Sequence, residues 1–160
     1  MAIKMRPSRD IDQLDMKILR ELSVNGRITV TELAGKVGLS KTPCLARLRR
    51  LETQGFVTGY RAIIDPAKVG LGHIAFVEVK LDNTTEKALR EFNAAVRKLP
   101  EVEQCHMIAG GFDYLLKVRT GDIAAYRQVL GEKISALPHL AQSSTYVAME
   151  AVKDEAGELG

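Results

Sequence analysis

Apolar side chains recur at helical spacing in three short segments of the N-terminal third of the chain. The first segment predicts a helix over residues 12–22, with Asp12 as its N-cap. Its apolar residues are Ile11, Leu14, Ile18 and Leu22. A second helix is expected from residue 29, because Thr29 and Glu32 have the spacing of a capping box. The third is expected over residues 40–54, with Cys44, Leu45, Leu48 and Leu51 on one face.

Glycines divide this region at the points where the chain must turn. Gly38 provides a left-handed position between the second and third helices, and Leu39 after it is expected to be buried. Three helices with this tight turn match the helix-turn-helix pattern. Residues 56–64 are typical of a β-hairpin that turns at Thr58-Gly59, which would add a wing. The sequence thus predicts a winged helix-turn-helix domain over residues 1–64.

The second half of the chain alternates strand-like and helix-like patterns. A linker with one proline and two glycines, residues 65–72, precedes it. Strands are expected over residues 73–81, 102–109, 114–119 and 140–149, and helices over residues 84–99 and 122–137. Pro100 and Pro138 end the two helices. The order β-α-β-β-α-β predicts a ferredoxin-like domain over residues 73–152, an α+β fold overall, and a short frayed tail at 153–160.

Composition favours an ordinary globular protein without a membrane segment. Of 160 residues, 46% are hydrophobic and 27% are charged, and no uncharged apolar run approaches the roughly 18 residues of a membrane helix. No apolar segment follows the first basic residues, so no signal peptide is expected. Two cysteines, Cys44 and Cys105, exclude a disulfide scaffold and fit a reducing, cytoplasmic location.

Charge is distributed unevenly between the two predicted domains. Residues 1–64 carry 12 Lys and Arg against 6 Asp and Glu, a net charge of +6. Residues 65–160 carry 11 against 14, a net charge of −3. This asymmetry suggests two functions on one chain, with a polyanion as partner of the first.

The third helix is the candidate element for binding double-stranded DNA. Its solvent face combines small residues with arginines, which can neutralise phosphates or pair with guanine in the major groove. Residues near the N-terminus of such a helix usually reach the base edges. The candidate DNA-binding residues are Ser40, Lys41, Thr42, Pro43, Ala46, Arg47, Arg49 and Arg50. A merely solvated basic helix face is the alternative interpretation, which the helix-turn-helix context disfavours.

Five short segments resemble one family of regulators. They are SKTPCLARLRRLE at residues 40–52, GFV at 55–57, GY at 59–60, GGFDY at 110–114 and YVAME at 146–150. Over residues 12–153 the chain resembles the Lrp/AsnC (feast/famine) regulators, most closely the leucine-responsive subgroup. The resemblance implies a DNA-binding N-terminal domain and a C-terminal domain that dimerises through its sheet. It also implies assembly of dimers into tetramers or octamers, and an amino-acid effector bound between dimers. Lys41, Ala46 and Gly111 depart from the pattern of the leucine-responsive relatives, which leaves the operator and the effector open.

The loop between the two central strands is the candidate effector site. Backbone N–H groups of a glycine-rich turn can hold a carboxylate, and Asp113 could hold an ammonium group. The candidate effector-binding residues are Met107, Ile108, Gly110, Gly111, Asp113, Tyr114 and Tyr146. From these residues alone, a simple strand connection with turn glycines is the alternative.

No arrangement of residues indicates catalysis, a cofactor or a metal site. His73, His106 and His139 are scattered, and neighbours on a strand such as Cys105 and His106 point to opposite faces. Gly110-Gly111 lacks the spacing of nucleotide-binding loops. The sequence therefore predicts a DNA-binding transcription regulator that responds to a small molecule through its assembly. The alternatives are an architectural DNA-binding protein without an effector and a small-molecule sensor or enzyme subunit.

Overall fold

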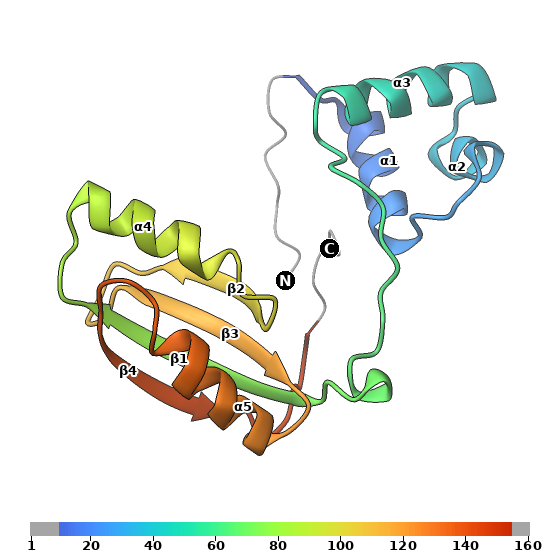
Figure 1. The fold of residues 1–160 in the computed structure, drawn as a ribbon. Helices are drawn as coiled ribbons and strands as arrows, with labels where there is room; N and C mark the ends of the chain where they lie inside the picture. Colours follow the sequence, from blue (N-terminus) through green and yellow to red (C-terminus); the bar gives the residue numbers. More distant parts are fainter. Residues whose placement is uncertain (1–9, 155–160) are drawn as a thin grey trace. The chain divides into compact units, whose positions relative to one another are not determined.

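A computed structural model describes residues 10–154 of the chain, and these form two compact units (Figure 1). The first unit runs up to Ile63 and the second comprises Ile64–Val152. Most of the predicted tail at 153–160 lies outside the described residues. No helix among the residues described is long and apolar enough to cross a membrane.

The first unit contains the three predicted helices, α1 (Gln13–Val24), α2 (Val30–Val37) and α3 (Lys41–Thr53). Asp12 caps α1 and forms a capping box with Asp15, and Thr29 forms the predicted capping box with Glu32 on α2. Gly38 ends α2 with a left-handed φ of 78°, which turns the chain into α3. The fully buried members of the core are Ile18, Leu33, Ala34, Val37, Cys44 and Leu51.

The predicted hairpin over residues 56–64 is wrong, since none of residues 54–72 forms a strand. The backbone N–H groups of Phe56 and Val57 both donate to the Leu51 carbonyl, at 2.9 and 3.2 Å. They therefore complete the C-terminus of α3, after Gly55 with a φ of 77°, and are unavailable for a strand partner. The Tyr60 ring meanwhile lies against Gly26, where an added Cβ would come within 3.3 Å of it.

The second unit is the predicted β-α-β-β-α-β fold. Its elements are the 3₁₀ turn η1 (Ala67–Val69), β1 (His73–Leu81), α4 (Glu86–Val96), β2 (Val102–Met107), β3 (Tyr114–Thr120), α5 (Ile123–Val129), η2 (Leu130–Ile134) and β4 (Leu140–Val147). The strands form one antiparallel sheet in the order β2-β3-β1-β4. The predicted helix over 122–137 is α-helical only in its first half, because η2 continues it as a π-helix. Predicted ends of the strands differ from the observed ones by at most two residues.

Both α-helices of the second unit pack on the same face of the sheet. Phe92 and Val96 of α4 and Tyr126 of α5 belong to one buried cluster with alternate residues of the strands. The strand residues of that cluster are Ala75, Val77, Val79, Leu81, Tyr114, Leu116 and Val118. The opposite face carries Phe76 and Tyr146, which pair across β1 and β4, and no element among residues 10–154 covers it within the unit.

Candidate DNA-binding and effector sites

The outward surface of α3 presents most of the predicted DNA-binding residues. Ser40, Lys41, Thr42, Pro43, Ala46, Arg49 and Arg50 are exposed. Ser40 is the N-cap by backbone geometry, but its side chain makes no capping hydrogen bond, and the first turn of α3 contains no acidic residue. The positive end of the α3 dipole is thus not offset by an acid of its own first turn, as it is in α1 and α2. Such an end attracts phosphate.

Arg47 and Arg50 have a second role, which the sequence analysis missed. Arg47 Nη1 lies 2.7 Å from Asp12 Oδ2 and 2.8 Å from Asp15 Oδ1. Arg50 Nη2 lies 2.5 Å from Asp15 Oδ2. Two arginines of the candidate recognition helix therefore share two carboxylates at the start of α1. The available signal was Asp15 itself, an acidic residue three positions before Ile18 on the buried face of α1.

Hydrogen bonds and neighbouring charges keep Asp12, Asp15 and Arg47 ionised. Burial raises the pKa of Asp15, but the backbone N–H of Asp12 and the guanidiniums of Arg47 and Arg50 outweigh burial and hold that pKa below its usual value. The backbone N–H of Asp15 and the Arg47 side chain likewise lower the pKa of Asp12. Hydrogen bonds to both carboxylates raise the pKa of Arg47. Both acids are thus charged wherever the protein is folded at neutral pH.

The loop between β2 and β3 is tied to the neighbouring strands through Asp113. The Ile108 N–H donates to the Asp113 carbonyl at 2.8 Å, and the Asp113 N–H donates to Val79 at 2.9 Å. Asp113 Oδ2 accepts from the Leu81 N–H at 2.7 Å. Gly110 and Gly111 are exposed and have no left-handed φ, and a Cβ at Gly111 would meet nothing within 4 Å. Turn geometry within residues 10–154 therefore does not explain the glycine at position 111.

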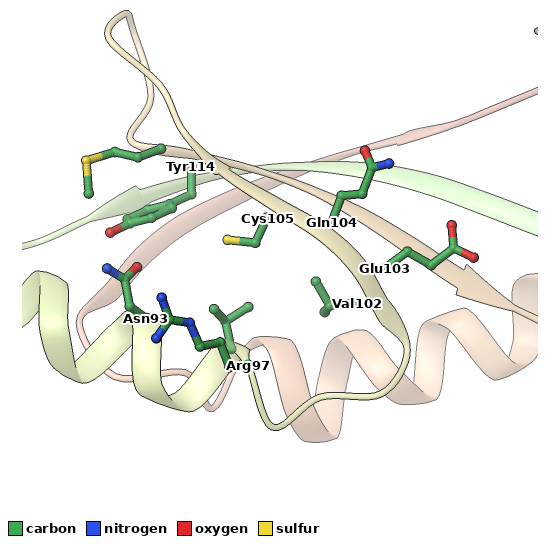
Figure 2. Close-up of a pocket in the computed structure, with 9 residues that line it drawn as sticks. Asn93, Arg97, Val102, Glu103, Gln104, Cys105 and Tyr114 are labelled. Atoms are coloured by element: carbon green, nitrogen blue, oxygen red, sulfur yellow. The ribbon is translucent and has the colours of Figure 1, made fainter. Parts of the chain in front are cut away.

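A recess of about 470 Å³ lies beside this loop, between α4 and the edge strand β2 (Figure 2). Its lining residues are Asn93, Val96, Arg97, Val102, Glu103, Gln104, Cys105, Met107 and Tyr114. Asn93 and Arg97 point from α4 toward the strands, where Tyr114 and Cys105 face them (Figure 2). Burial raises the pKa of Tyr114 and of Cys105, so both groups are neutral at physiological pH. The recess thus offers one cation, Arg97, among neutral and apolar groups, while the carboxylate of Glu103 pairs with Lys117 and Arg119 instead.

The predicted effector residues are only partly brought together. Met107 and Tyr114 line the recess, and Ile108, Gly110, Gly111 and Asp113 form the adjoining loop. Tyr146 lies apart from them on β4, at the opposite edge of the sheet from β2, and is 54% exposed. It pairs with Phe76, whereas Tyr114 pairs with Val79 near the other end of β1. One chain therefore does not place Tyr146 at the loop.

The part of the chain that the structure describes contains no group of three or more His, Cys, Asp or Glu side chains arranged to hold a metal ion. Cys44 is buried in the core of the first unit, and Cys105 is partly buried. The expected absence of a metal site remains a prediction from the sequence.

Comparisons with known proteins identify both units. The model of the winged helix-turn-helix DNA-binding family matches residues 11–58, and that of the Lrp/AsnC ligand binding domain matches residues 74–157. The chain is 63% identical over 145 residues to a proline dehydrogenase transcriptional activator of Rhodobacter capsulatus, covering 91% of this chain and 94% of that protein. It is 48% identical over 150 residues to the leucine-responsive regulatory protein of Escherichia coli K12, covering 94% and 92%.

A solved structure agrees with these sequence matches. The transcriptional regulator of Neisseria meningitidis in complex with L-Met superposes with a TM-score of 0.86 at 35% identity, over 92% of this chain and 95% of that one. The fold predicted from the sequence, an N-terminal helix-turn-helix unit followed by a ferredoxin-like unit, is thereby confirmed. The chain belongs to the Lrp/AsnC family of DNA-binding transcription regulators, with a family ligand-binding domain, and it is not an enzyme.

Proposed function

We propose that the chain is a cytoplasmic, amino-acid-responsive regulator that binds double-stranded DNA through α3, and that proline is the first effector to test. The observation that carries this proposal is the exposed N-terminal half of α3, which combines Lys41 and Thr42 with an uncapped helix end. A ligand-binding unit follows it on the same chain. Proline is favoured because the relative at 63% identity activates proline dehydrogenase transcription.

The β2–β3 loop and the recess beside it support an amino-acid effector. Asp113 uses Oδ2 to accept the Leu81 N–H, which leaves Oδ1 to receive an ammonium group. The exposed backbone at Gly110-Gly111 can donate to a carboxylate without interference from a Cβ. Met107, which is exposed, supplies apolar surface at the same end of β2. These groups match the charges of a free amino acid, since each of its two ionised ends has a partner.

The uncovered face of the sheet is the proposed homodimer surface. Phe76 and Tyr146 are adjacent and exposed on it, while Lys117 of β3 is buried there beside Glu103, at 3.5 Å. An exposed aromatic pair on an uncovered sheet is typical of an interaction surface. Assembly of such dimers into tetramers or octamers, as the family resemblance implies, would give several α3 helices access to one stretch of DNA and raise the avidity.

Fluorescence anisotropy tests this proposal directly. Wild-type protein is titrated at fixed salt onto DNA from upstream of its own gene, DNA from upstream of a proline dehydrogenase gene, and an unrelated fragment. Each titration is repeated with proline, leucine or methionine. Tighter binding to either upstream fragment, shifted by one amino acid, is the expected result. Thr42→Ala is expected to weaken that preference, whereas Lys87→Gln on α4 of the other unit is not.

A specific result would favour the architectural alternative. Equal affinity for all three fragments, unaffected by any amino acid, would mean that the second unit only oligomerises. In that outcome the loop at residues 108–113 is a strand connection, and α3 contacts mainly phosphates.

A further inference from the structure

Asp15 is a buried, ionised carboxylate directly beneath the candidate recognition helix. It is 1% exposed, yet it accepts hydrogen bonds from the Asp12 N–H, from Arg47 and from Arg50. An unpaired charge at such a position would cost several kcal/mol, so the two arginines and the backbone donor are necessary for it to be tolerated. The carboxylate and the arginines therefore hold one another in place.

The cations of α3 fall into two classes as a consequence. Arg47 and Arg50 face two negative charges, those of Asp12 and Asp15, so this cluster of four residues has no net charge. Lys41 and Arg49 are exposed and form no ion pair with any residue between 10 and 154. Only the second class enters the DNA complex with its full charge available.

We propose that Asp15 is a positioning residue for DNA recognition: it holds Arg47 and Arg50 in place and, together with Asp12, cancels their charge. Their remaining N–H groups then contribute to sequence discrimination, while Lys41 and Arg49 supply the salt-dependent attraction to phosphate. This inference rests on the proposed DNA binding by α3. It also explains why α3, the helix proposed to bind DNA, carries two arginines whose charges are neutralised by the carboxylates of Asp12 and Asp15.

The physical basis is the difference between phosphate attraction and base contact. A cation that neutralises a phosphate releases a counterion, and each such contact changes the slope of log K against log salt by about −0.9. An arginine already paired with a carboxylate releases no additional counterion. Its fixed guanidinium can still donate to a base edge, because a guanidinium has five N–H groups and the ion pairs use few of them.

The test compares salt slopes and specificity ratios of full-length variants. Asp15→Asn is expected to steepen the slope by up to about 0.9, because Arg50 is released and can reach a phosphate while Arg47 keeps its pair with Asp12. The ratio of affinities for preferred and unrelated DNA is expected to fall at least about fivefold, the lower end for one lost base contact. Arg49→Gln is expected to flatten the slope by about 0.9, and Arg50→Gln by less than half as much.

Two control variants show whether an effect comes from the position of the lost carboxylate, from the change in net charge, or from unfolding. Glu21→Gln makes the same charge change on α1, in an exposed pair with Lys36 of α2 at 2.6 Å, and is expected to steepen the slope less than Asp15→Asn does. Asp12→Asn removes one charge from beside Arg47 at an exposed site, and asparagine is as good an N-cap as aspartate. This variant is expected to fold normally and to steepen the slope by up to about 0.9, so it decides the question if Asp15→Asn is unfolded.

Three results would overturn the inference. They are an unchanged slope in both aspartate variants, equal slope changes for Arg50→Gln and Arg49→Gln, and equal effects of Glu21→Gln and Asp15→Asn. In each of these cases the arginines act as ordinary phosphate ligands. Wild-type protein that binds no DNA at all would instead refute the proposed function, and the two failures are thereby distinguished.

Discussion

Replacing Gly38 by alanine tests whether the turn into α3 depends on backbone conformation alone. Gly38 has φ 78° and ψ 34°, and a Cβ added there would meet nothing within 4 Å. No contact is therefore lost or blocked, and only the left-handed conformation is affected. That conformation costs a residue with a Cβ about 1–2 kcal/mol.

The net effect must include the unfolded chain. Alanine restricts the unfolded state and so returns about 0.4–1 kcal/mol of stability. The expected net destabilisation of the first unit by Gly38→Ala is therefore about 1 kcal/mol. Gly35 provides the matched control, because it lies within α2, the helix that Gly38 ends. A Cβ added at Gly35 would also meet no atom within 4 Å, but Gly35 has no left-handed φ. Gly35→Ala is expected to stabilise the unit by about 0.5–1 kcal/mol.

Hydrogen–deuterium exchange of the full-length protein provides the assay, since it reports the two units separately. Amides of α1–α3 that exchange by unfolding of their unit should exchange about fivefold faster in Gly38→Ala and more slowly in Gly35→Ala. Amides of β1 and β3 should exchange at the wild-type rate in both variants. If Gly38→Ala were neutral or stabilising, the left-handed turn would not be a constraint on the first unit, and the reasoning would be refuted.

Three further predictions concern other parts of the molecule. Arg50→Ala should weaken binding to preferred DNA by about 1–3 kcal/mol and change the sequence preference in competition anisotropy; an unchanged preference would remove Arg50 from the base contacts. Asp12 and Asp15 have lowered pKa values in the folded chain, so their stabilisation is complete above the ordinary aspartate pKa of about 3.9 and is lost as the pH falls toward the folded values. The protection of α1 amides, which is the exchange rate of an unstructured amide at the same pH divided by their own, should thus fall on acidification below about pH 4, and unchanged or increased protection there would contradict the assignment. Phe92→Ala removes a fully buried ring that packs 4.4 Å from the Tyr114 ring, and should destabilise the second unit by about 3–5 kcal/mol in thermal unfolding; a loss under 1 kcal/mol would show that the site can collapse around the cavity.

Local patterns predicted the elements because local hydrogen bonds determine where they begin and end. The capping boxes at Asp12 and Thr29 and the left-handed Gly38 are interactions between residues close in sequence, and all three are present. The ferredoxin-like fold of the second unit followed from the alternation of strand-like and helix-like patterns along the chain. The hairpin prediction failed for a local reason too, since the N–H groups that it needed complete the C-terminus of α3 after Gly55. Gly55 was the signal for that outcome.

The helical pattern of the sequence could not predict which side chains pair between distant parts of the chain. A helical projection places Arg50 on the solvent side of α3, and its backbone position agrees with that. Its long side chain nevertheless reaches back to Asp15, which is 35 residues earlier in the sequence. Nothing in the spacing of the two residues indicates this contact. The general lesson is that a projection predicts the direction of a Cβ and not the position of a guanidinium several bonds further out.

The separation of Tyr146 from the β2–β3 loop, which is the proposed effector site, affects how a ligand could act. Within one chain the two lie at different edges and different ends of the same sheet, so a ligand at the loop has no contact with Tyr146. A site that contains both must be completed by a second chain. A ligand bound there would necessarily prefer one assembly over another, because only the assembled state offers all of its contacts, and it would shift the population toward that state. Sedimentation with and without proline measures this shift. Altered DNA affinity at constant mass and shape would exclude it, and the effector would then act within a single chain.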